Sequence, residues 1–479
     1  MKICVLQPDY STSIVDYRHY DPTRDLARLA PQHQVDHVKL HKLTVYKQLR
    51  ALAREGYDIF VNLTDGYLEW DIPSIDVIHS LDALGLPYTG PSAALYHPAK
   101  ELMKYVAQST GVRIPAYDVV ESVDELARVA RRLFFPLFVK PSWAGDSLGI
   151  DEHSLARDAE ALRAKVVATL PDYPQLLVEE YIEGREFTVL VMATPDGPRH
   201  CTSFLPIEFI FDHGAKFKTY AMKTSELHPD ANVPVRDAAL AARLRSAAEK
   251  VFTGFNGVGY ARMDFRMDPQ GDLYFLEVNF SCSLFYSDGL EGSTDYILKH
   301  DGIGQAGFLE MIIVEGRTRY ERKQKLYVVR GSSIAGFGIY ARRDIAPGEV
   351  VFKGEERSQR IVTREYVRQH WSADEQEVFR HYAYPLSDEV FVLWADDPAD
   401  WAPQNHSCEP NTVLRGLDLV AQHAVPKGAE LTLDFATLQN PESEPFTCNC
   451  GTASCRGQIS GTPGNSVTVR EKARRIGRA

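Results

Sequence analysis

The sequence has no apolar run long enough to cross a membrane, and its first apolar stretch, residues 3–6, is too short for the core of a signal peptide. We therefore expect a cytoplasmic protein with no membrane partner. Basic residues are also in the minority, with 53 Lys and Arg against 65 Asp and Glu and a net charge of −12. Because phosphate backbones are bound by clustered Lys and Arg, this balance argues against a nucleic-acid partner. The one basic run, within residues 463–479, is expected to be a solvated tail.

Cysteine is scarce, with 7 in 479 residues, and unevenly placed. Three are scattered, whereas the other four lie near the carboxyl end, at Cys408, Cys448, Cys450 and Cys455. Cytoplasmic thiols stay reduced, so the clustering points to a metal and not to disulfides. The three cysteines of segment 448–455 leave a tetrahedral zinc site one ligand short, and Cys408 is the nearest further cysteine in the sequence. The pattern predicts a Zn²⁺ site, in preference to cysteines buried together by chance.

The length of 479 residues and the 44% hydrophobic content predict several domains with sizeable cores. In the first part of the chain, strand-like runs at residues 3–6 and 58–63 alternate with helical runs at residues 46–54 and 75–84. This alternation is typical of an α/β fold with a parallel sheet.

Residues 259–280 predict a β-hairpin with polar chemistry on one face. Arg262 and Asp264 alternate with apolar residues in its first half, and Glu277 and Asn279 do so in its second half. Such a face is often simply exposed to water. If the face is enclosed, its acids need a cation, and oxygen ligands suit Mg²⁺, which typically binds carboxylates together with substrate phosphates. The hairpin therefore favours a nucleotide site.

A second candidate for phosphate binding follows a short predicted strand at residues 138–140. Gly145 and Gly149 would let backbone amides approach a phosphate, and Lys140 adds positive charge just before them. A flexible surface turn explains the same glycines equally well.

In this order, five motifs resemble the ATP-grasp superfamily, and most closely its D-alanine:D-alanine ligase branch. The motifs are residues 86–90, Lys100, residues 135–141, residues 178–186 and the hairpin, and the resemblance covers roughly residues 1–310. It implies an α/β and α+β ATP-grasp part that uses ATP and Mg²⁺ to activate a carboxylate as an acyl phosphate. An amine then displaces phosphate and an amide forms.

The resemblance also implies roles for individual residues. Those implied to bind ATP are Lys100, Lys140 and Lys223 at the phosphates, Ser147 in the phosphate loop, Glu179, Glu180 and Ile182 beside the adenine, and Glu186 at the ribose. Those implied to bind Mg²⁺ are Asp264, Glu277 and Asn279, and Arg262 is implied to face the acyl phosphate.

The sequence departs from the ligase pattern where substrates would be bound. After Asn279 the ligases have a Pro-Gly step and then a serine that holds the acceptor carboxylate, whereas this chain has residues 281–283, Ser-Cys-Ser, and Asp288. An acid would repel a carboxylate and attract an ammonium group. The departure predicts an acceptor that is basic or lacks the α-carboxylate.

The last third of the chain carries three local signals in order. They are Gly336-Phe337-Gly338, the loop that begins Asn405-His406, and the cysteine-rich segment that follows Phe446. A lone Gly-x-Gly is usually only a turn. Together, over residues 324–462, the three resemble a SET-domain methyltransferase with its post-SET zinc segment, which is mainly β. The resemblance implies S-adenosylmethionine (SAM) as a cofactor, bound at these glycines, Phe337, Asn405, His406 and Phe446.

One departure concerns the catalytic tyrosine of SET enzymes, whose position is occupied by Phe435. Three explanations stay open. Tyr382 or Tyr384 supplies a hydroxyl from another strand, the acceptor needs none, or the domain binds SAM without turnover. Core packing is the ordinary role for either tyrosine.

The sequence therefore predicts six segments: an N-terminal α/β domain (1–95), an ATP-grasp domain (96–315), a linker (316–325), a SET domain (326–440), a post-SET zinc segment (441–462) and a basic tail (463–479). We expect a bifunctional biosynthetic enzyme that joins a small-molecule carboxylate to an amine, with an amino acid or peptide among its substrates, and that N-methylates an amine. The alternatives are a protein-lysine methyltransferase with an ATP-grasp accessory domain and a ligase with a non-catalytic SET module. Because related ligases are commonly dimers, a homodimer is expected.

Overall fold

A computed structural model describes residues 1–11, 13, 21–66, 72–144, 148–211, 231–354, 357, 359–387, 389–394, 401–438 and 445–460. The chain divides into two compact units, Met1–Arg322 and Lys323–Ala479. Among the described residues, no helix is both long and apolar enough to span a membrane.

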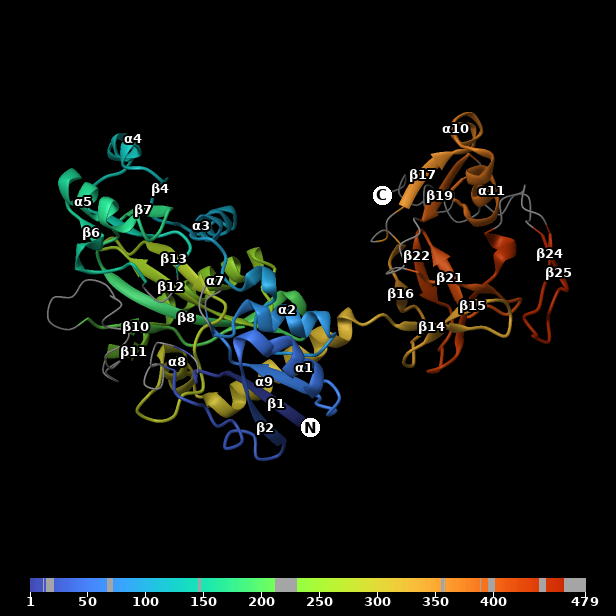
Figure 1. Cartoon of the computed structure of the whole chain (residues 1–479), viewed down its shortest axis with the longest axis horizontal. Coiled ribbons are helices and arrows are strands. Elements are labelled where there is room, and N and C mark those ends of the chain that lie inside the picture. Colours follow the sequence, from blue (N-terminus) through green and yellow to red (C-terminus); the bar gives the residue numbers. More distant parts are fainter. Residues whose placement is uncertain are drawn as a thin grey trace. The chain divides into compact units, whose positions relative to one another are not determined.

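The first layer of the larger unit is a three-stranded parallel sheet. Its strands in spatial order are β2 (Gln34–Leu40), β1 (Lys2–Pro8) and β3 (Ile59–Asn62). Alternate residues of β1 face opposite sides: Ile3 and Val5 pack towards α9 (Gly304–Lys323), whereas Cys4 and Leu6 pack towards α1 (Val45–Leu52) and α2 (Ile75–Ala83). The predicted α/β pattern thus becomes a sheet with helices on both faces (Figure 1).

Two antiparallel sheets build the rest of this unit. The smaller sheet consists of β4 (Tyr117–Val120), β7 (Leu176–Glu180), β5 (Leu137–Pro141) and β6 (Leu155–Ala156), covered by α4 (Leu126–Arg132) and α5 (Ala159–Thr169). The larger sheet consists of β11 (Asn232–Pro234), β10 (Ile207–Phe209), β8 (Arg185–Thr194), β12 (Tyr260–Met267) and β13 (Leu273–Asn279), with β9 (Gly197–Ser203) on β8. Helices α3 (Lys100–Ser109) and α7 (Ala238–Gly254) pack on it, and α8 (Ser293–Asp301) follows β13 in the chain.

The predicted hairpin is formed by β12 and β13, and β12 also pairs with β8 on its other side. Its register places Arg262 opposite Asn279 and Asp264 opposite Glu277. The apolar side chains between them, among them Met263 and Phe265, belong to the buried cluster under α3 and α7. The hairpin's polar face is therefore held on a rigid, doubly paired strand.

The stretch expected as a linker, residues 316–325, is mostly helical because α9 continues to Lys323. Two pairs one turn apart, Glu315 with Arg319 and Arg317 with Glu321, support the helix along this charge-rich part. Arg319 also donates hydrogen bonds to the carbonyl oxygens of Tyr88 and Gly90, at 2.7 and 2.8 Å. This part of the helix is thus packed against the first unit.

The smaller unit is mainly β, as predicted. One sheet consists of β14 (Tyr327–Gly331), β15 (Phe337–Ala341), β23 (Glu430–Leu433) and β20 (Asn405–His406). A second sheet consists of β16 (Val350–Phe352), β22 (Asp418–Ala421) and β21 (Thr412–Arg415). A third sheet consists of β17 (Gln359–Thr363), β19 (Val390–Trp394) and β18 (Tyr384–Pro385). Helices α10 (Arg364–His370) and α11 (Ala373–Tyr382) lie beside the third sheet (Figure 1). The short pair β24 (Phe446–Thr447) and β25 (Gln458–Ile459) carries the cysteine-rich segment between its strands.

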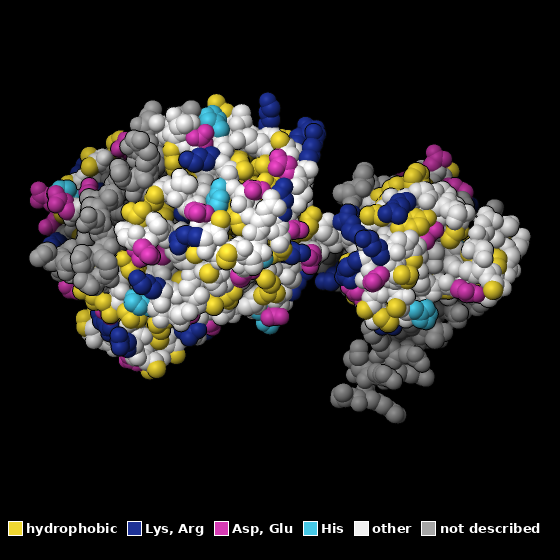
Figure 2. All heavy atoms as spheres, turned by 90° about the horizontal axis from the view of Figure 1, so that it is seen from below, with side chains coloured by type: hydrophobic (Ala, Val, Ile, Leu, Met, Phe, Trp, Pro, Cys, Tyr) yellow, Lys and Arg dark blue, Asp and Glu magenta, His cyan; other side chains and the backbone are white. Residues whose placement is uncertain are grey.

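The described part of the chain also has single 3-10 turns at η1 (Lys42–Thr44), η2 (Ala93–Leu95), η3 (Val123–Glu125), η4 (Glu152–Ser154) and η7 (Phe435–Thr437). On the face of the larger unit that Figure 2 displays, acidic and basic side chains are interspersed.

Gly259, at the start of the hairpin, gives a direct test of this packing. It has φ +67°, and a Cβ there would overlap the carbonyl of Gly90, whereas Gly271 in the hairpin turn has φ +87° and open space around it. We expect Gly259→Ala to lower the free energy of unfolding by about 3 kcal/mol or more, because it combines backbone strain with a clash. Gly271→Ala, which carries the strain alone, should cost about 1 kcal/mol. Thermal and urea unfolding of both variants measures this, and equal losses would contradict the close approach.

Candidate functional site

A cleft in the larger unit brings most of the predicted ATP-grasp residues together. It opens between the sheet that contains β5 and β7 and the face of β12 and β13, and it contains ≈ 700 Å³ of space including its open mouth. Its lining residues are Phe138, Lys140, Ile150, Glu179, Glu180, Tyr181, Ile182, Glu186, Arg262, Asp264, Arg266, Leu276 and Glu277. This size and this mixture of apolar and convergent charged groups are typical of a small-molecule site.

One wall of the cleft contains a buried carboxylate between two lysines. Glu179 on β7 pairs with Lys140 on β5 at 2.5 Å and with Lys104 on α3 at 2.7 Å, and all three side chains are at least nine-tenths buried. Burial alone would raise the pKa of Glu179, but the two lysines hold it below its ordinary value. Glu179 is thus an ionised part of the wall. Two positive charges against one negative charge leave an excess that suits phosphate oxygens.

Lys104 was missed at the level of sequence because it lies inside an amphipathic helix, one turn after Lys100. Its burial lowers the pKa of its ammonium group to about 8, although Glu179 acts in the opposite direction. Lys100, at the start of the same helix, is also buried, and it donates a hydrogen bond to the carbonyl of Ala144. The glycine-rich loop that follows contains Ser147, which lies outside the described residues, as does Lys223.

The polar face of the hairpin forms the opposite wall, so it is enclosed and not an ordinary wet face. Arg262 Nε lies 3.5 Å from Asp264 Oδ1, and both side chains are only about one-seventh exposed, at 15 and 13%. Among the described residues, Asp264 Oδ1 and Asn279 Nδ2 are buried without a hydrogen bond. With Glu277 opposite Asp264, this is an oxygen-rich donor set whose buried, unsatisfied carboxylate oxygen fits a divalent cation.

The remaining predicted residues lie at the far end of the cleft. Glu180 accepts a hydrogen bond from the backbone N–H of Phe134 at 2.9 Å, which fixes the end of β7. Glu186, on β8, faces Arg266, on β12, across the sheet. Arg266 donates to Glu186 Oε2 from Nε at 3.1 Å and from Nη2 at 3.0 Å, and to the carbonyl of Ile182 at 2.8 Å. Arg266 was not predicted, because a third charged residue in the alternating pattern of a strand carries no separate signal.

A second, smaller cleft lies where the hairpin continues into residues 281–284. It is lined by Arg24, Asn62, Leu63, Thr64, Asp65, Pro91, Tyr96, Tyr260, Ser281, Cys282 and Leu284. Ser283 donates a hydrogen bond to Asp65 at 3.3 Å. Asp288 does not line either cleft, because it lies in an exposed turn. The structure therefore places Asp65, from the loop after β3, near the end of the hairpin. Asp65 is far from the hairpin in the sequence, so no local pattern predicted this.

In the smaller unit, the predicted SAM-binding segments come together around Glu430. The amide of Asn405 donates to Glu430 Oε1 at 2.8 Å and to the carbonyl of Phe337 at 3.1 Å. Gly338 is packed so closely against the Glu430 carboxylate that a Cβ would overlap it, and Gly336 has φ +49°. The Gly-x-Gly sequence is therefore required by packing here and is more than a surface turn.

His406 and the aromatic residues near it form a second part of this site. The backbone N–H of Phe435 donates to His406 Nδ1 at 3.0 Å, so the ring proton of His406 is on Nε2. This Nε2 atom lies 3.4 Å from Cys408 Sγ. The rings of His406, Phe435 and Phe446 lie within 5.7–6.1 Å of one another, measured between centroids. Position 435 thus presents an aromatic ring without a hydroxyl.

The two candidate tyrosines differ in environment. Tyr382, at the end of α11, is 72% exposed. Tyr384, on β18, is half-buried and stacks against Trp394 with a centroid distance of 6.2 Å. Burial raises the pKa of the Tyr384 hydroxyl above its ordinary value.

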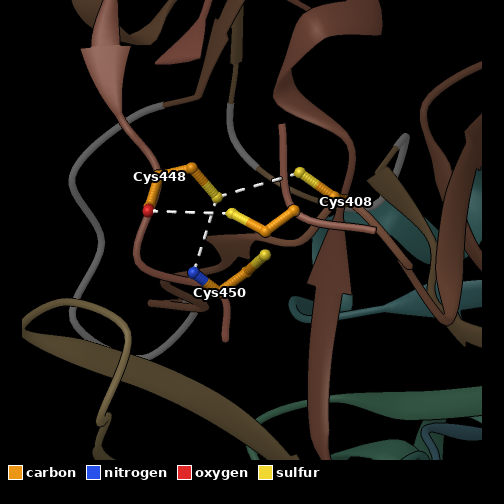
Figure 3. A group of neighbouring side chains, drawn as sticks. Cys408, Cys448 and Cys450 are labelled. Atoms are coloured by element: carbon orange, nitrogen blue, oxygen red, sulfur yellow. Dashed lines mark hydrogen bonds between the residues drawn. The ribbon is translucent and has the colours of Figure 1, made fainter. Parts of the chain in front are cut away.

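The four clustered cysteines converge, as Figure 3 shows for the three it labels. The sulfur atoms of Cys408, Cys448, Cys450 and Cys455 all lie within 4.8 Å of one another, and Cys408 Sγ is 3.8 Å from Cys448 Sγ. A tetrahedral Zn²⁺ with bonds of about 2.3 Å requires sulfur separations of about 3.8 Å. Arg456 donates to Cys408 Sγ from its backbone N at 3.2 Å and from Nε at 3.4 Å. Such donors stabilise thiolates, so the cluster fits a metal.

Known proteins resemble both parts of the chain. Residues 106–284 match the family model of the D-ala D-ala ligase C-terminus, and residues 336–436 match that of the SET domain. The D-alanine–D-alanine ligase B of Chromobacterium violaceum is 30% identical over 240 residues, which make up 49% of this chain and 74% of the relative. The D-alanine–D-alanine ligase of Geobacter sulfurreducens is 29% identical over 273 residues, 56% of this chain and 81% of the relative.

A solved structure agrees at the level of fold. The D-alanine-D-alanine ligase from Coxiella burnetii has a TM-score of 0.51 and 15% identity, and the match covers 68% of this chain and 98% of that one. The predicted fusion and its fold class are confirmed. By its ATP-grasp part this chain belongs to the D-alanine–D-alanine ligase family, and it carries a SET domain behind that part.

Proposed function

We propose that the larger unit joins a carboxylate to an amine through an acyl phosphate, at the expense of ATP. The observation that carries this proposal is the single cleft in which a lysine-rich wall faces the polar side of the hairpin. Phosphoryl transfer requires positioning and charge stabilisation more than covalent help from the protein, and these residues supply both.

The roles follow from position. Lys140, held by Glu179, would stabilise phosphate oxygens on one side, and Arg262 would stabilise the charge that develops on the acyl phosphate on the other. Asp264, Glu277 and Asn279 would hold Mg²⁺, which when bound neutralises phosphate charge. The amine then attacks the acyl carbon, phosphate leaves, and no covalent bond to the protein is needed.

The substrates are proposed to differ from those in the names of its relatives. The second cleft lies at the end of the hairpin and offers Ser281 and Cys282, where the ligase pattern has other residues, together with Asp65. An acid at this place favours an amine-bearing substrate. Asp288 lies outside both clefts, so we assign this role to Asp65, which lines the second cleft.

For the smaller unit we propose SAM-dependent N-methylation, with Tyr384 as the candidate hydroxyl and zinc on the four cysteines. The assembly of Gly336–Gly338, Asn405 and His406 around Glu430 supports a cofactor site. A second candidate, a SAM-binding module without turnover, is favoured by Phe435, whose position lacks the hydroxyl expected of an active SET enzyme.

The ligase proposal predicts the effect of one carboxylate in the cleft. With ATP, Mg²⁺ and a panel of amino acids and small amines, we expect ADP release with at least one pair. Glu277→Gln should lower kcat by about 100-fold or more, because charge stabilisation at the reacting phosphate is lost. Asp272→Asn is the matched control, since this acid lies on the same hairpin and pairs with Arg113 outside the cleft. No ADP release with any pair would contradict the proposal.

Methyl transfer is tested with labelled SAM, and mass spectrometry locates the label. We expect label on a small-molecule amine and a rate about 100-fold lower for Tyr384→Phe, because a hydroxyl that positions the deprotonated amine is removed. Tyr382→Phe should leave the rate unchanged. SAM binding without label in any acceptor would favour the binding module, and label only on proteins would overturn the small-molecule proposal.

The metal proposal predicts about one Zn²⁺ per chain by elemental analysis. Cys450→Ser should lose most of this zinc and lower the unfolding temperature of the smaller unit, because a structural metal contributes folding free energy. Cys201→Ser, a cysteine of the larger unit outside the cluster, is the control and should keep full zinc. Equal zinc in both variants would exclude the four-cysteine site.

A further inference from the structure

Arg266 is a buried arginine in the nucleotide cleft that the proposed reaction leaves without a role. It is 3% exposed and lines the cleft together with Tyr181, Ile182 and Glu186. Its guanidinium contacts the carboxylate of Glu186, the carbonyl of Ile182 and the ring of Tyr181, whose centroid lies 4.5 Å away. Burying an arginine is costly unless its charge is paired and its N–H groups have acceptors, and an apolar side chain at this position would avoid that cost. We therefore expect Arg266 to contribute something that an apolar side chain could not.

The position of Arg266 relates it to the sugar of a nucleotide. Arg266 lies two residues after Asp264 on β12, about 7 Å along the strand, and both side chains line the same cleft. Phosphates held at Lys140 and Arg262, and at a Mg²⁺ on Asp264, would therefore extend the next part of the ligand, its sugar, towards Glu186 and Arg266.

The contact with Glu186 uses only one carboxylate oxygen. Nε and Nη2 of Arg266 both donate to Oε2, at 3.1 and 3.0 Å. Glu186 lines the cleft, and the second oxygen of an ionised carboxylate can accept hydrogen bonds from hydroxyl groups. The pair is neutral as a whole, so that this acceptor does not add a net negative charge beside a triphosphate.

We propose that Arg266 is a positioning residue that orients Glu186 to accept a hydrogen bond from a ribose hydroxyl, and so makes the cleft selective for ribonucleotides. The inference rests on the proposed nucleotide cleft. It predicts that the cleft discriminates between ATP and an ATP analogue that lacks the 2′- or the 3′-hydroxyl, and that this discrimination depends on Arg266.

The experiment measures binding of Mg²⁺ complexes of ATP, 2′-deoxy-ATP and 3′-deoxy-ATP to the full chain by calorimetry. We expect the wild type to bind ATP at least 10-fold more tightly than one of the two analogues. Glu186→Gln and Arg266→Met should each reduce that ratio to about 1 to 3, because the first weakens the acceptor and the second releases it. In the double variant, the ratio should fall no further, since both residues act through one hydrogen bond.

Two further variants separate positioning from general stability. Arg185→Met removes another Arg–Glu pair of the same sheet, with Glu208, outside the cleft, and should leave the ratio at its wild-type value. If Arg266→Met does not fold, Arg266→Lys carries the test: it keeps the charge but loses the two-nitrogen contact, and we expect at least a 3-fold loss of discrimination.

The outcomes are distinct. If the wild type binds no nucleotide, the proposed nucleotide cleft itself fails. If it binds all three equally, or if Arg266→Met and Arg266→Lys weaken all three nucleotides by the same factor, the cleft stands but Arg266 is only a structural residue and the inference is overturned.

Discussion

The cleft of the larger unit depends on one buried interaction, the carboxylate of Glu179 between Lys104 and Lys140. It joins helix α3, strand β5 and strand β7, and it does so away from water, where an unpaired charge would be expensive. Because two cations share one anion, the wall keeps a positive excess. Desolvation lowers the pKa of Lys104 to about 8, so part of this positive charge is lost when the pH rises above that value.

In the smaller unit, too, one carboxylate connects several elements. Glu430 receives hydrogen bonds from Ser332, Tyr340 and Asn405, which tie the Gly336–Gly338 segment to the Asn405–His406 strand. His406 then extends the connection, since it accepts from Phe435 on one side and lies beside Cys408 on the other. Arg456 donates hydrogen bonds to both Cys408 and Asp434 and so links the cysteine cluster to the segment that contains Asp434. The cysteine cluster, the Gly336–Gly338 segment and the Asn405–His406 strand are thus parts of one hydrogen-bonded network.

Residue patterns within short stretches of the sequence were enough to predict several of these features. The alternation in residues 259–280 was enough to predict the hairpin and its charged face, since side chains of a strand alternate whatever the rest of the chain does. The spacing of Cys448, Cys450 and Cys455 predicted the cluster for a similar reason, because three ligands within eight residues meet through a single turn. Where the prediction relied on position after a motif, as with Asp288, the residue lies in an exposed turn and lines neither cleft.

What the sequence determined by itself is the chemistry available at each short stretch: a phosphate-and-cation pattern in the first part of the chain and a thiol cluster near its end. The tertiary structure alone decided which distant groups complete those stretches. Lys104 reaches Glu179, Arg266 reaches Glu186 over 80 residues, and Asp65 reaches Ser283 over 218 residues. Such contacts follow from strand register and helix packing. These depend on how side chains are buried across the whole unit, and the periodicity of a short stretch of sequence does not specify them.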